Sequence, residues 1–222
     1  MWLKKKKILI TGASVGIGSA IAERFAKEGA NLYLLGGQNE KALNETIEIC
    51  KKFNVQVQGE CSDLSDLSVV PKLMSKAMDF LEGIDILVNC AGGDIGAAGT
   101  GAPMAGKPPK NDAVFIDLED VHTVLERNLM TCILCCREVA PEMIERKTGH
   151  IVSIGSTAGL FGTEGSAIYA TAKAGMHAYT RCLAEQLRPY NITANVVAPG
   201  EIETARFLAS RVVDEDMRLE GG

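Results

Sequence analysis

The chain has 222 residues, of which 46% are hydrophobic and 23% are charged, and its formal net charge at pH 7 is −5. This composition is ordinary for a globular α/β domain with a sizeable core, and the negative charge argues against a protein that binds nucleic acid or an anionic membrane. No stretch approaches the roughly 18 apolar residues of a membrane span, and the apolar run after Lys4–Lys7 is too short for a signal peptide.

The seven cysteines are irregularly spaced, which predicts a reducing compartment, the cytoplasm, and no disulfide framework. Cys132, Cys135 and Cys136 follow a helical pattern with no His or Asp beside them. We therefore expect them to be small buried core residues, and we expect no metal site.

Short apolar strands alternate with amphipathic helical patterns along the chain. The predicted strands are Lys6–Thr11, Asn31–Leu35, Val55–Gly59, Ile84–Val88, His150–Ile154 and Ile192–Val197. The predicted helices are one that ends near Glu28, Glu40–Phe53, Leu67–Leu81, Leu118–Arg146, and one that carries Tyr169 and Lys173 and ends near Leu187. Repeated strand–helix units predict a doubly wound parallel sheet with helices on both faces. Because no linker or repeat divides the sequence, residues 1–222 are expected to form one domain.

The first strand leads directly into a glycine-rich turn, Gly12 to Gly18, and then into a helix and a second strand. This is the order of elements in units that bind a dinucleotide. Glycines let the backbone turn tightly and approach the pyrophosphate, and the amides at the helix N-terminus attract its charge. The alternative is that these glycines only shape a loop.

Tyr169 and Lys173 lie four residues apart in a helical pattern, so their side chains share one face. An ammonium group beside a phenol favours the phenolate, which lowers a tyrosine pKa of about 10 and suits proton exchange near neutral pH. Taken alone, the pair is more typical of an ordinary surface helix.

Polar residues fall at the carboxyl ends of the predicted strands: Thr11, Asp63, Asn89, Ser156 and Pro199–Gly200. In open parallel sheets the ligand binds beyond these carboxyl ends, so the positions predict one common site. The irregular segment Gly93–Ile116 leaves from the same edge. A loop of this length is uncommon in a compact domain, and it fits a substrate lid or a plain surface excursion equally well.

Together these motifs resemble the short-chain dehydrogenase/reductase family over essentially the whole chain. The matching elements are TGxxxGIG at Thr11–Gly18, NAG at Asn89–Gly92, an asparagine at Asn128, a serine at Ser156, YxxxK at Tyr169–Lys173 and PG at Pro199–Gly200, with Thr204 soon after. The serine stands at the family's usual distance before the tyrosine.

The resemblance implies four catalytic residues. Tyr169 would donate a proton to the carbonyl oxygen in reduction or remove the alcohol proton in oxidation, and Ser156 would hydrogen-bond that oxygen. Lys173 would lower the tyrosine pKa and bind the nicotinamide ribose. Asn128 would hold a water that passes protons from Lys173 to solvent, unless it is a plain polar helix residue.

The resemblance also implies a site for NAD(H) or NADP(H). The implied cofactor-binding residues are Gly12, Ser14, Val15, Gly16, Ile17, Gly18, Gly37, Asp63, Leu64, Asn89, Ala91, Gly92, Tyr169, Lys173, Pro199, Gly200, Ile202 and Thr204. The three motif glycines would line the pyrophosphate, and Ile202 and Thr204 would touch the carboxamide. Asn89 would border the adenosine, and Asp63 would meet the adenine amino group or would only cap a helix.

The choice between the two cofactors is normally visible after the second strand, where an acid selects NAD and an arginine accommodates the NADP phosphate. The segment Leu35–Asn39 contains neither, and Val15 stands where another NADP-favouring base is frequent. Without a cation for the phosphate, NAD is favoured.

The sequence also stops soon after an apparent helix that begins at Thr204, whereas members of the family continue through a further helix and a last strand. We therefore expect the sequence to omit a C-terminal portion and the last strand. The strand Ile192–Val197 would then be an exposed sheet edge.

The leading interpretation is an oxidoreductase that interconverts a secondary alcohol and a ketone, similar to 3-oxoacyl reductases or to dehydrogenases of polyols, sugars or cyclic alcohols. Leu160 and Phe161 favour a partly hydrophobic small-molecule substrate. The alternatives are a catalytically reduced dinucleotide-binding regulatory protein and a cofactor-dependent isomerase or dehydratase. The resemblance implies a homodimer or homotetramer, formed through the long helices that begin near Leu118 and Ser166.

Overall fold

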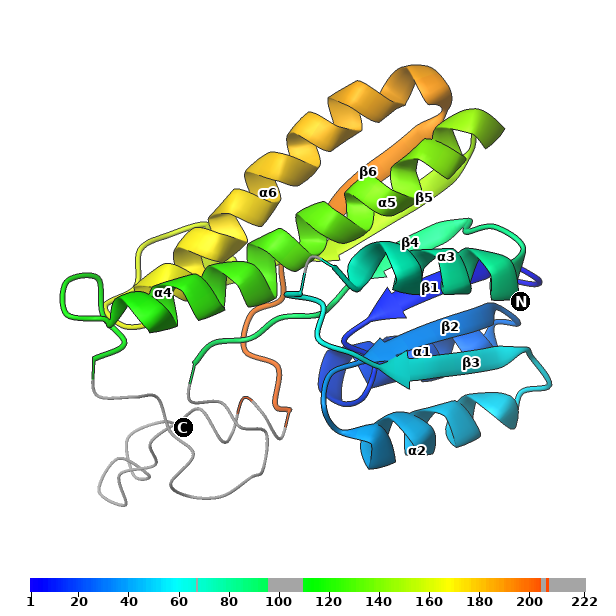
Figure 1. Ribbon diagram of the computed structural model, residues 1–222, viewed down its shortest axis with the longest axis horizontal. Helices are drawn as coiled ribbons and strands as arrows, with labels where there is room; N and C mark the ends of the chain where they lie inside the picture. Colours follow the sequence, from blue (N-terminus) through cyan, green and yellow to red (C-terminus); the bar gives the residue numbers. More distant parts are fainter. Residues whose placement is uncertain (67, 96–109, 205–206, 208–222) are drawn as a thin grey trace.

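The computed structural model describes residues 1–66, 68–95, 110–204 and 207. In this part of the chain six strands form one sheet in the order β3-β2-β1-β4-β5-β6, and every neighbouring pair is parallel (Figure 1). The strands are β1 (Lys7–Thr11), β2 (Asn31–Gly36), β3 (Val57–Cys61), β4 (Ile86–Asn89), β5 (Gly149–Ile154) and β6 (Ile192–Val197). The helices are α1 (Gly16–Lys27), α2 (Glu40–Lys51), α3 (Val70–Leu81), α4 (Leu118–Leu125), α5 (Thr131–Arg146) and α6 (Ala167–Leu187).

Helices cover both faces of the sheet, as predicted. Successive side chains of a strand point to opposite faces, so Ile8 and Ile10 of β1 pack with α1 and α2, whereas Leu9 packs with α3, α5 and α6. Cys132, Cys135 and Cys136 lie in the second of these cores and are buried, also as predicted. Fully burying one Leu or Ile side chain stabilises the folded state by about 1.5–3 kcal/mol, so the helices on both faces contribute to the stability of the sheet.

The strand order changes direction between β1 and β4. The chain runs from β1 to β2 and β3 on one side, and from β4 to β5 and β6 on the other. Thr11 and Asn89, the last residues of β1 and β4, are register partners at this point. A crevice at such a reversal is where doubly wound folds bind their ligands. The polar residues predicted to share an edge are either the last residues of their strands, as Thr11 and Asn89 are, or follow the strands by a few residues.

The start of α3 differs from the prediction, because the helix begins at Val70 instead of Leu67. The carboxylate of Asp63 accepts hydrogen bonds from the amide and hydroxyl of Ser65, and Asp66 does the same with Ser68. These local turns compete with the helix for the backbone amides and delay its first turn. Strand β3 is likewise two residues later than predicted, since Asn54 adopts φ +55° before the strand begins.

The long helix predicted at Leu118–Arg146 is interrupted by a π-helical turn at Glu126–Met130. Such turns are rare and occur frequently at functional sites, and Asn128 lies at the centre of this one. Most of the predicted irregular segment, residues 96–109, and most of the helix predicted from Thr204 lie outside the described residues. Within the described ranges, no helix is long and apolar enough to cross a membrane.

Candidate active site

The glycine turn after β1 lies against the segment that follows β4. Gly12 has φ +67°, and a Cβ atom at this position would lie 2.8 Å from backbone atoms of Cys90 and Ala91. A Cβ on Gly18, in the first turn of α1, would overlap the carbonyl oxygen of Gly12. Both positions therefore need glycine for the turn to close on α1.

The N-terminus of α1 fits the pyrophosphate of a dinucleotide. The helix begins at Gly16, its N-cap residue Val15 makes no side-chain hydrogen bond to the first turn, and that turn contains no acidic residue. The amides of Val15 to Gly18 therefore face no competing cap or negative charge, and the helix dipole favours an anion in front of them.

Thr11 joins the two halves of this edge. Its Oγ1 atom accepts hydrogen bonds from the amides of Cys90 and Ala91, each at 3.1 Å. The neighbouring Asn89 donates from Nδ2 to Cys136 Sγ at 3.2 Å, while its buried Oδ1 has no partner among the described residues. An unpaired buried acceptor at the crevice is consistent with a site shaped for a polar ligand.

The end of β2 is closed to side chains. A Cβ on Gly36 would overlap Ser14 Oγ and would lie 3.0 Å from Cys61 Sγ. A Cβ on Gly37, by contrast, would have no atom within 4 Å, and Asn39 uses its side chain to cap α2 through the amide of Ala42. An acid that selects NAD or an arginine that accommodates NADP would stand at the end of β2, where this chain has the uncharged residues Gly36 and Gly37.

Asp63 and Leu64 follow the end of β3. The carboxylate of Asp63 is exposed and binds Ser65, so the structure shows a turn at this residue and not the helix N-cap considered as the alternative. Leu64 is buried against the core that contains α3. The Oδ2 atom of Asp63 has no hydrogen bond in the described part of the chain, so it is able to accept one from a ligand.

Tyr169 and Lys173 lie together in the first two turns of α6. The Lys173 Nζ atom is 5.6 Å from the centroid of the Tyr169 ring, and it donates a 2.9 Å hydrogen bond to the carbonyl oxygen of Ile154. Lys173 is 4% exposed, whereas Tyr169 is half-buried. A buried cation is costly without partners, so its position beside the phenol and the end of β5 is specific.

Ser156 lies two residues beyond Ile154, the last residue of β5, whose carbonyl oxygen accepts the hydrogen bond from the same lysine. Its Oγ atom accepts a hydrogen bond from the amide of Ala158 at 3.2 Å, and its own amide donates to His177 Nε2 at 3.4 Å. A hydroxyl that accepts one hydrogen bond still has its proton to donate. The structure thus brings Ser156, Tyr169 and Lys173 to one edge of the sheet.

Asn128 is fully buried and clamps the segment after β4. Its Oδ1 atom accepts from the amide of Gly93, and Nδ2 donates to the carbonyl oxygens of Gly93 and Val124, all at 2.9 Å. A Cβ on Gly92 would lie 2.5 Å from Asn128 Oδ1 and 3.4 Å from Lys173 Nζ. Asn128 and Lys173 therefore flank Gly92 from two helices, and Ala91 and Gly92 lie between the glycine turn and this pair.

The predicted residues after β6 reach the same edge from the other side. The carbonyl oxygen of Pro199 accepts the amide of Thr157 at 2.9 Å, and Gly200 is exposed. The Cγ2 atom of Thr204 would be 3.3 Å from a Cβ on Gly16, so this residue lies beside the glycine turn. Ile202 is half-exposed and accepts the amide of Thr204.

Two partners of these residues were not predicted from the sequence. The sequence marks the double acceptor Thr11 as a polar strand end and as the first residue of TGxxxGIG, but not as a partner of these amides, and it does not single out His177. His177 follows Lys173 by four residues on α6, and this spacing was the available signal that it shares the lysine's face.

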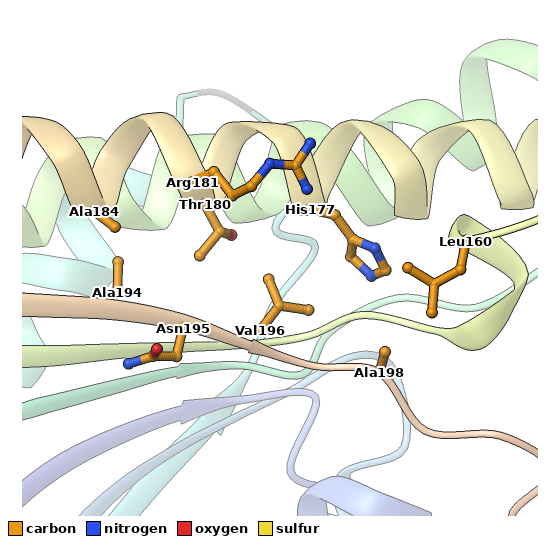
Figure 2. Close-up of a pocket in the computed structure, with 9 residues that line it drawn as sticks. All are labelled: Leu160, His177, Thr180, Arg181, Ala184, Ala194, Asn195, Val196 and Ala198. Atoms are coloured by element: carbon orange, nitrogen blue, oxygen red, sulfur yellow. The ribbon is translucent and has the colours of Figure 1, made fainter.

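A groove of about 300 Å³ runs between α6 and β6 (Figure 2). Its lining residues are Leu160, His177, Thr180, Arg181, Ala184, Ala194, Asn195, Val196 and Ala198. Neither Tyr169 nor Ser156 borders it, so we do not assign this groove to the substrate.

Comparison with known proteins places the chain in one family. Residues 6–212 match the family model described as short chain dehydrogenase. The 3-oxoacyl-[acyl-carrier-protein] reductase FabG of Aquifex aeolicus is 35% identical over 91% of this chain and 76% of its own length. The cyclohexanol dehydrogenase of Rhodococcus sp. (strain TK6) is 31% identical over 92% of this chain and 77% of its own length.

A solved structure of an NAD+-bound xylitol dehydrogenase aligns with a TM-score of 0.79 at 28% identity, over 90% of this chain and 72% of that one. The fold, the glycine turn and the relatives agree. The chain therefore belongs to the short-chain dehydrogenase/reductase family and is an NAD(P)-dependent oxidoreductase of alcohols and ketones.

Proposed function

We propose that this enzyme interconverts a secondary alcohol and a ketone with Tyr169 as the proton donor in reduction and the proton acceptor in oxidation. The observation that carries the proposal is the position of Lys173, whose buried Nζ lies 5.6 Å from the Tyr169 ring centroid. A positive charge at this range favours the ionised phenol, so the tyrosine can exchange a proton. When bound, the nicotinamide cofactor supplies or accepts the hydride.

Ser156 orients the substrate oxygen in this proposal. Its Oγ accepts from Ala158, so the hydroxyl proton can be donated to the carbonyl oxygen that Tyr169 protonates. Two donors on one oxygen stabilise the negative charge that develops there during reduction. Lys173 additionally holds the nicotinamide ribose.

Asn128 serves first as the clamp on Gly93 and second as a water site. Both Nδ2 hydrogens are used by Gly93 and Val124, which leaves the second lone pair of Oδ1 for a water. Because Asn128 and Lys173 flank Gly92, such a water can carry protons from the lysine towards solvent.

The cofactor is held along the edge from β3 to β6. Gly12, Gly16 and Gly18, with the amides of Ser14, Val15 and Ile17, line the pyrophosphate. Gly37, Asp63, Leu64 and Asn89 border the adenosine, and Ala91, Gly92, Pro199, Gly200, Ile202 and Thr204 border the nicotinamide half. The fit rests on the uncapped N-terminus of α1 and on the closed glycine turn.

We propose a preference for NAD(H), because residues 36–39 offer no cation to the 2′-phosphate of NADP. The measurement is the ratio of kcat/KM with NADH and with NADPH on the same ketone, and a ratio below one contradicts the preference. Lys41, exposed at the start of α2, is the first cation along the chain after this segment. Lys41→Ala should therefore leave the ratio unchanged if no phosphate is bound there.

For the substrate, we propose a ketone or alcohol with an apolar part, such as an oxoacyl thioester or a cyclic alcohol. Leu160 and Phe161, in the loop between Ser156 and Tyr169, are each 63% exposed and provide an apolar wall. The similarity to a 3-oxoacyl reductase and a cyclohexanol dehydrogenase supports both classes.

We also propose that the protein forms a homodimer or homotetramer through α4, α5 and α6. The molar mass measured by light scattering tests this proposal.

The test of the proposed function is Tyr169→Phe, assayed by NADH absorbance on oxoacyl thioesters, cyclic ketones and polyols. Phe keeps the ring and removes only the hydroxyl, so turnover should fall by about 100-fold or more while NADH still binds. Unchanged turnover excludes the tyrosine as the proton donor. Turnover without any change of NADH absorbance would instead favour an isomerase or dehydratase.

A further inference from the structure

We infer that His177 is a positioning residue that holds the backbone of Ser156 in place for catalysis. The inference rests on the proposed role of Ser156. His177 is 6% exposed, and its Nε2 atom accepts the Ser156 amide hydrogen at 3.4 Å. This contact joins two residues that are 21 positions apart, so it ties the loop after β5 to helix α6.

Two glycines make room for the imidazole ring. A Cβ on Gly155 would overlap His177 Nε2, and a Cβ on Gly159 would lie 3.1 Å from Cε1 of the same ring. The ring is thus packed against the residues on either side of the Ser156 turn. A Cβ on Gly159 would lie even closer, at 2.8 Å, to backbone atoms of Lys173 and Ala174, so the two glycines let the loop pack closely on both the imidazole ring and the backbone of α6.

The hydrogen bond defines the state of the ring. A nitrogen that accepts carries no proton, so His177 is neutral with its proton on Nδ1. Burial, and then the positive charges of Lys173 and Arg181, lower the pKa of His177. The other elements bordering the ring contribute Leu160, Ala194, Asn195, Val196 and Ala198 to the shared groove, and none of these described residues is ionisable (Figure 2).

The consequence for catalysis follows from the position of His177 on α6. Lys173 and His177 lie one turn apart, so one helix carries Tyr169, its lysine and the group that fixes Ser156. The serine turn is also fastened by the Ala158 amide at Ser156 Oγ and by the Thr157 amide at Pro199. Loss of the His177 contact removes one restraint on the backbone of Ser156. We therefore expect the Ser156 hydroxyl to be less well oriented toward the substrate oxygen, while the cofactor site is unaffected.

The experiment compares His177→Leu, which fills the space without an acceptor, with His177→Gln, whose amide oxygen can reach the Nε2 position. In the Leu variant we expect kcat to fall about tenfold, the size of effect of one lost hydrogen bond, with the Kd for NADH within about twofold of the wild-type value. The Gln variant should recover most of kcat. Ala184→Val, at the other end of the groove, is the matched control and should keep wild-type kcat.

A pH profile provides a readout that a purely structural role would not change. Protonated imidazole presents N–H to the Ser156 N–H, so wild-type kcat should fall on the acid side, and the Gln variant should lose this dependence because its side chain does not titrate in this range. If His177→Leu does not fold, the comparison of the pH profiles of the wild type and His177→Gln tests the inference without it. A Leu variant with wild-type kcat, or a Gln variant with the wild-type acid limb, overturns the inference.

Ser156→Ala separates this inference from the proposed function. If Ser156→Ala keeps full turnover, the proposed role of the serine fails and the histidine has nothing to position. If Ser156→Ala loses turnover while His177→Leu does not, only the role of His177 fails.

Discussion

Lys173 fastens helix α6 to the sheet, because its Nζ atom donates a 2.9 Å hydrogen bond to the carbonyl oxygen of Ile154, the last residue of β5. Ser156 stands two residues after Ile154, and Tyr169 stands one turn before Lys173. The same buried cation is therefore a neighbour of the proposed proton donor and an anchor for the strand that leads to the proposed substrate-orienting serine.

Lys173→Met tests this double role. Methionine fills a similar volume without N–H groups or charge, so the tyrosine loses its cation and Ile154 loses a donor. We expect kcat to fall by about 100-fold or more in the ketone-reduction assay. Lys76→Met, at an exposed ion pair with Glu60, is the matched control for loss of a lysine and should keep wild-type kcat. Retention of turnover in Lys173→Met would show that the tyrosine needs no neighbouring cation.

Gly18→Ala should weaken dinucleotide binding. The added methyl group would overlap the carbonyl oxygen of Gly12, so the glycine turn or α1 must shift. We expect the Kd for NADH, followed by fluorescence, to rise about tenfold or more, since closing the turn depends on this approach. Gly162→Ala is the control, because no atom lies within 4 Å of its added Cβ and its Kd should not change. Equal Kd values for the two variants would show that the glycine turn does not contribute to NADH binding.

Thr11→Val should destabilise the protein more than Thr11→Ser, which keeps the hydroxyl and loses only one buried methyl group. Valine has the shape of threonine without the oxygen, so the amides of Cys90 and Ala91 lose their acceptor. A buried donor without a partner costs about 1–3 kcal/mol, which we expect as the loss in the free energy of unfolding measured with urea. Serine keeps the Oγ acceptor. Equal stabilities for the Val and Ser variants would show that this hydroxyl bridge carries no free energy.

The stability of the wild-type protein should fall in mildly acidic solution in part because of His177. Burial and the charges of Lys173 and Arg181 hold the pKa of this histidine below its ordinary value of 6.5. Between the folded pKa and 6.5 the unfolded chain binds a proton that the folded protein does not, so unfolding is favoured as the pH falls through this window. The contribution of the neutral ring is fully present above pH 6.5.

Urea titrations across this window compare the wild type with His177→Gln. The Gln variant has no imidazole to protonate, so its free energy of unfolding should fall less steeply as the pH is lowered. Identical slopes would mean that His177 has the same pKa in the folded and unfolded chains.

Much of the candidate site could be predicted from the sequence because its signals are local. Glycines at Gly12 and Gly18 and the four-residue spacing of Tyr169 and Lys173 are determined by turn and helix geometry alone. Alternation of apolar strands with amphipathic helices likewise predicted the doubly wound sheet. The errors at β3 and α3 arose where Asn54, Asp63 and Asp66 direct the backbone through local turns, which the hydrophobic periodicity does not register.

By itself, then, the sequence determined the resemblance to the family, the polar residues expected at the carboxyl ends of the strands and the residues that are proposed to transfer the proton. Only the tertiary structure decided which groups hold those residues. Thr11 binds amides 79 and 80 positions away, Asn128 binds Gly93 across 35 positions, and His177 binds Ser156 across 21. These pairs form because helices packed on a twisted sheet bring its carboxyl ends to a common edge, and no local pattern encodes which side chains then meet.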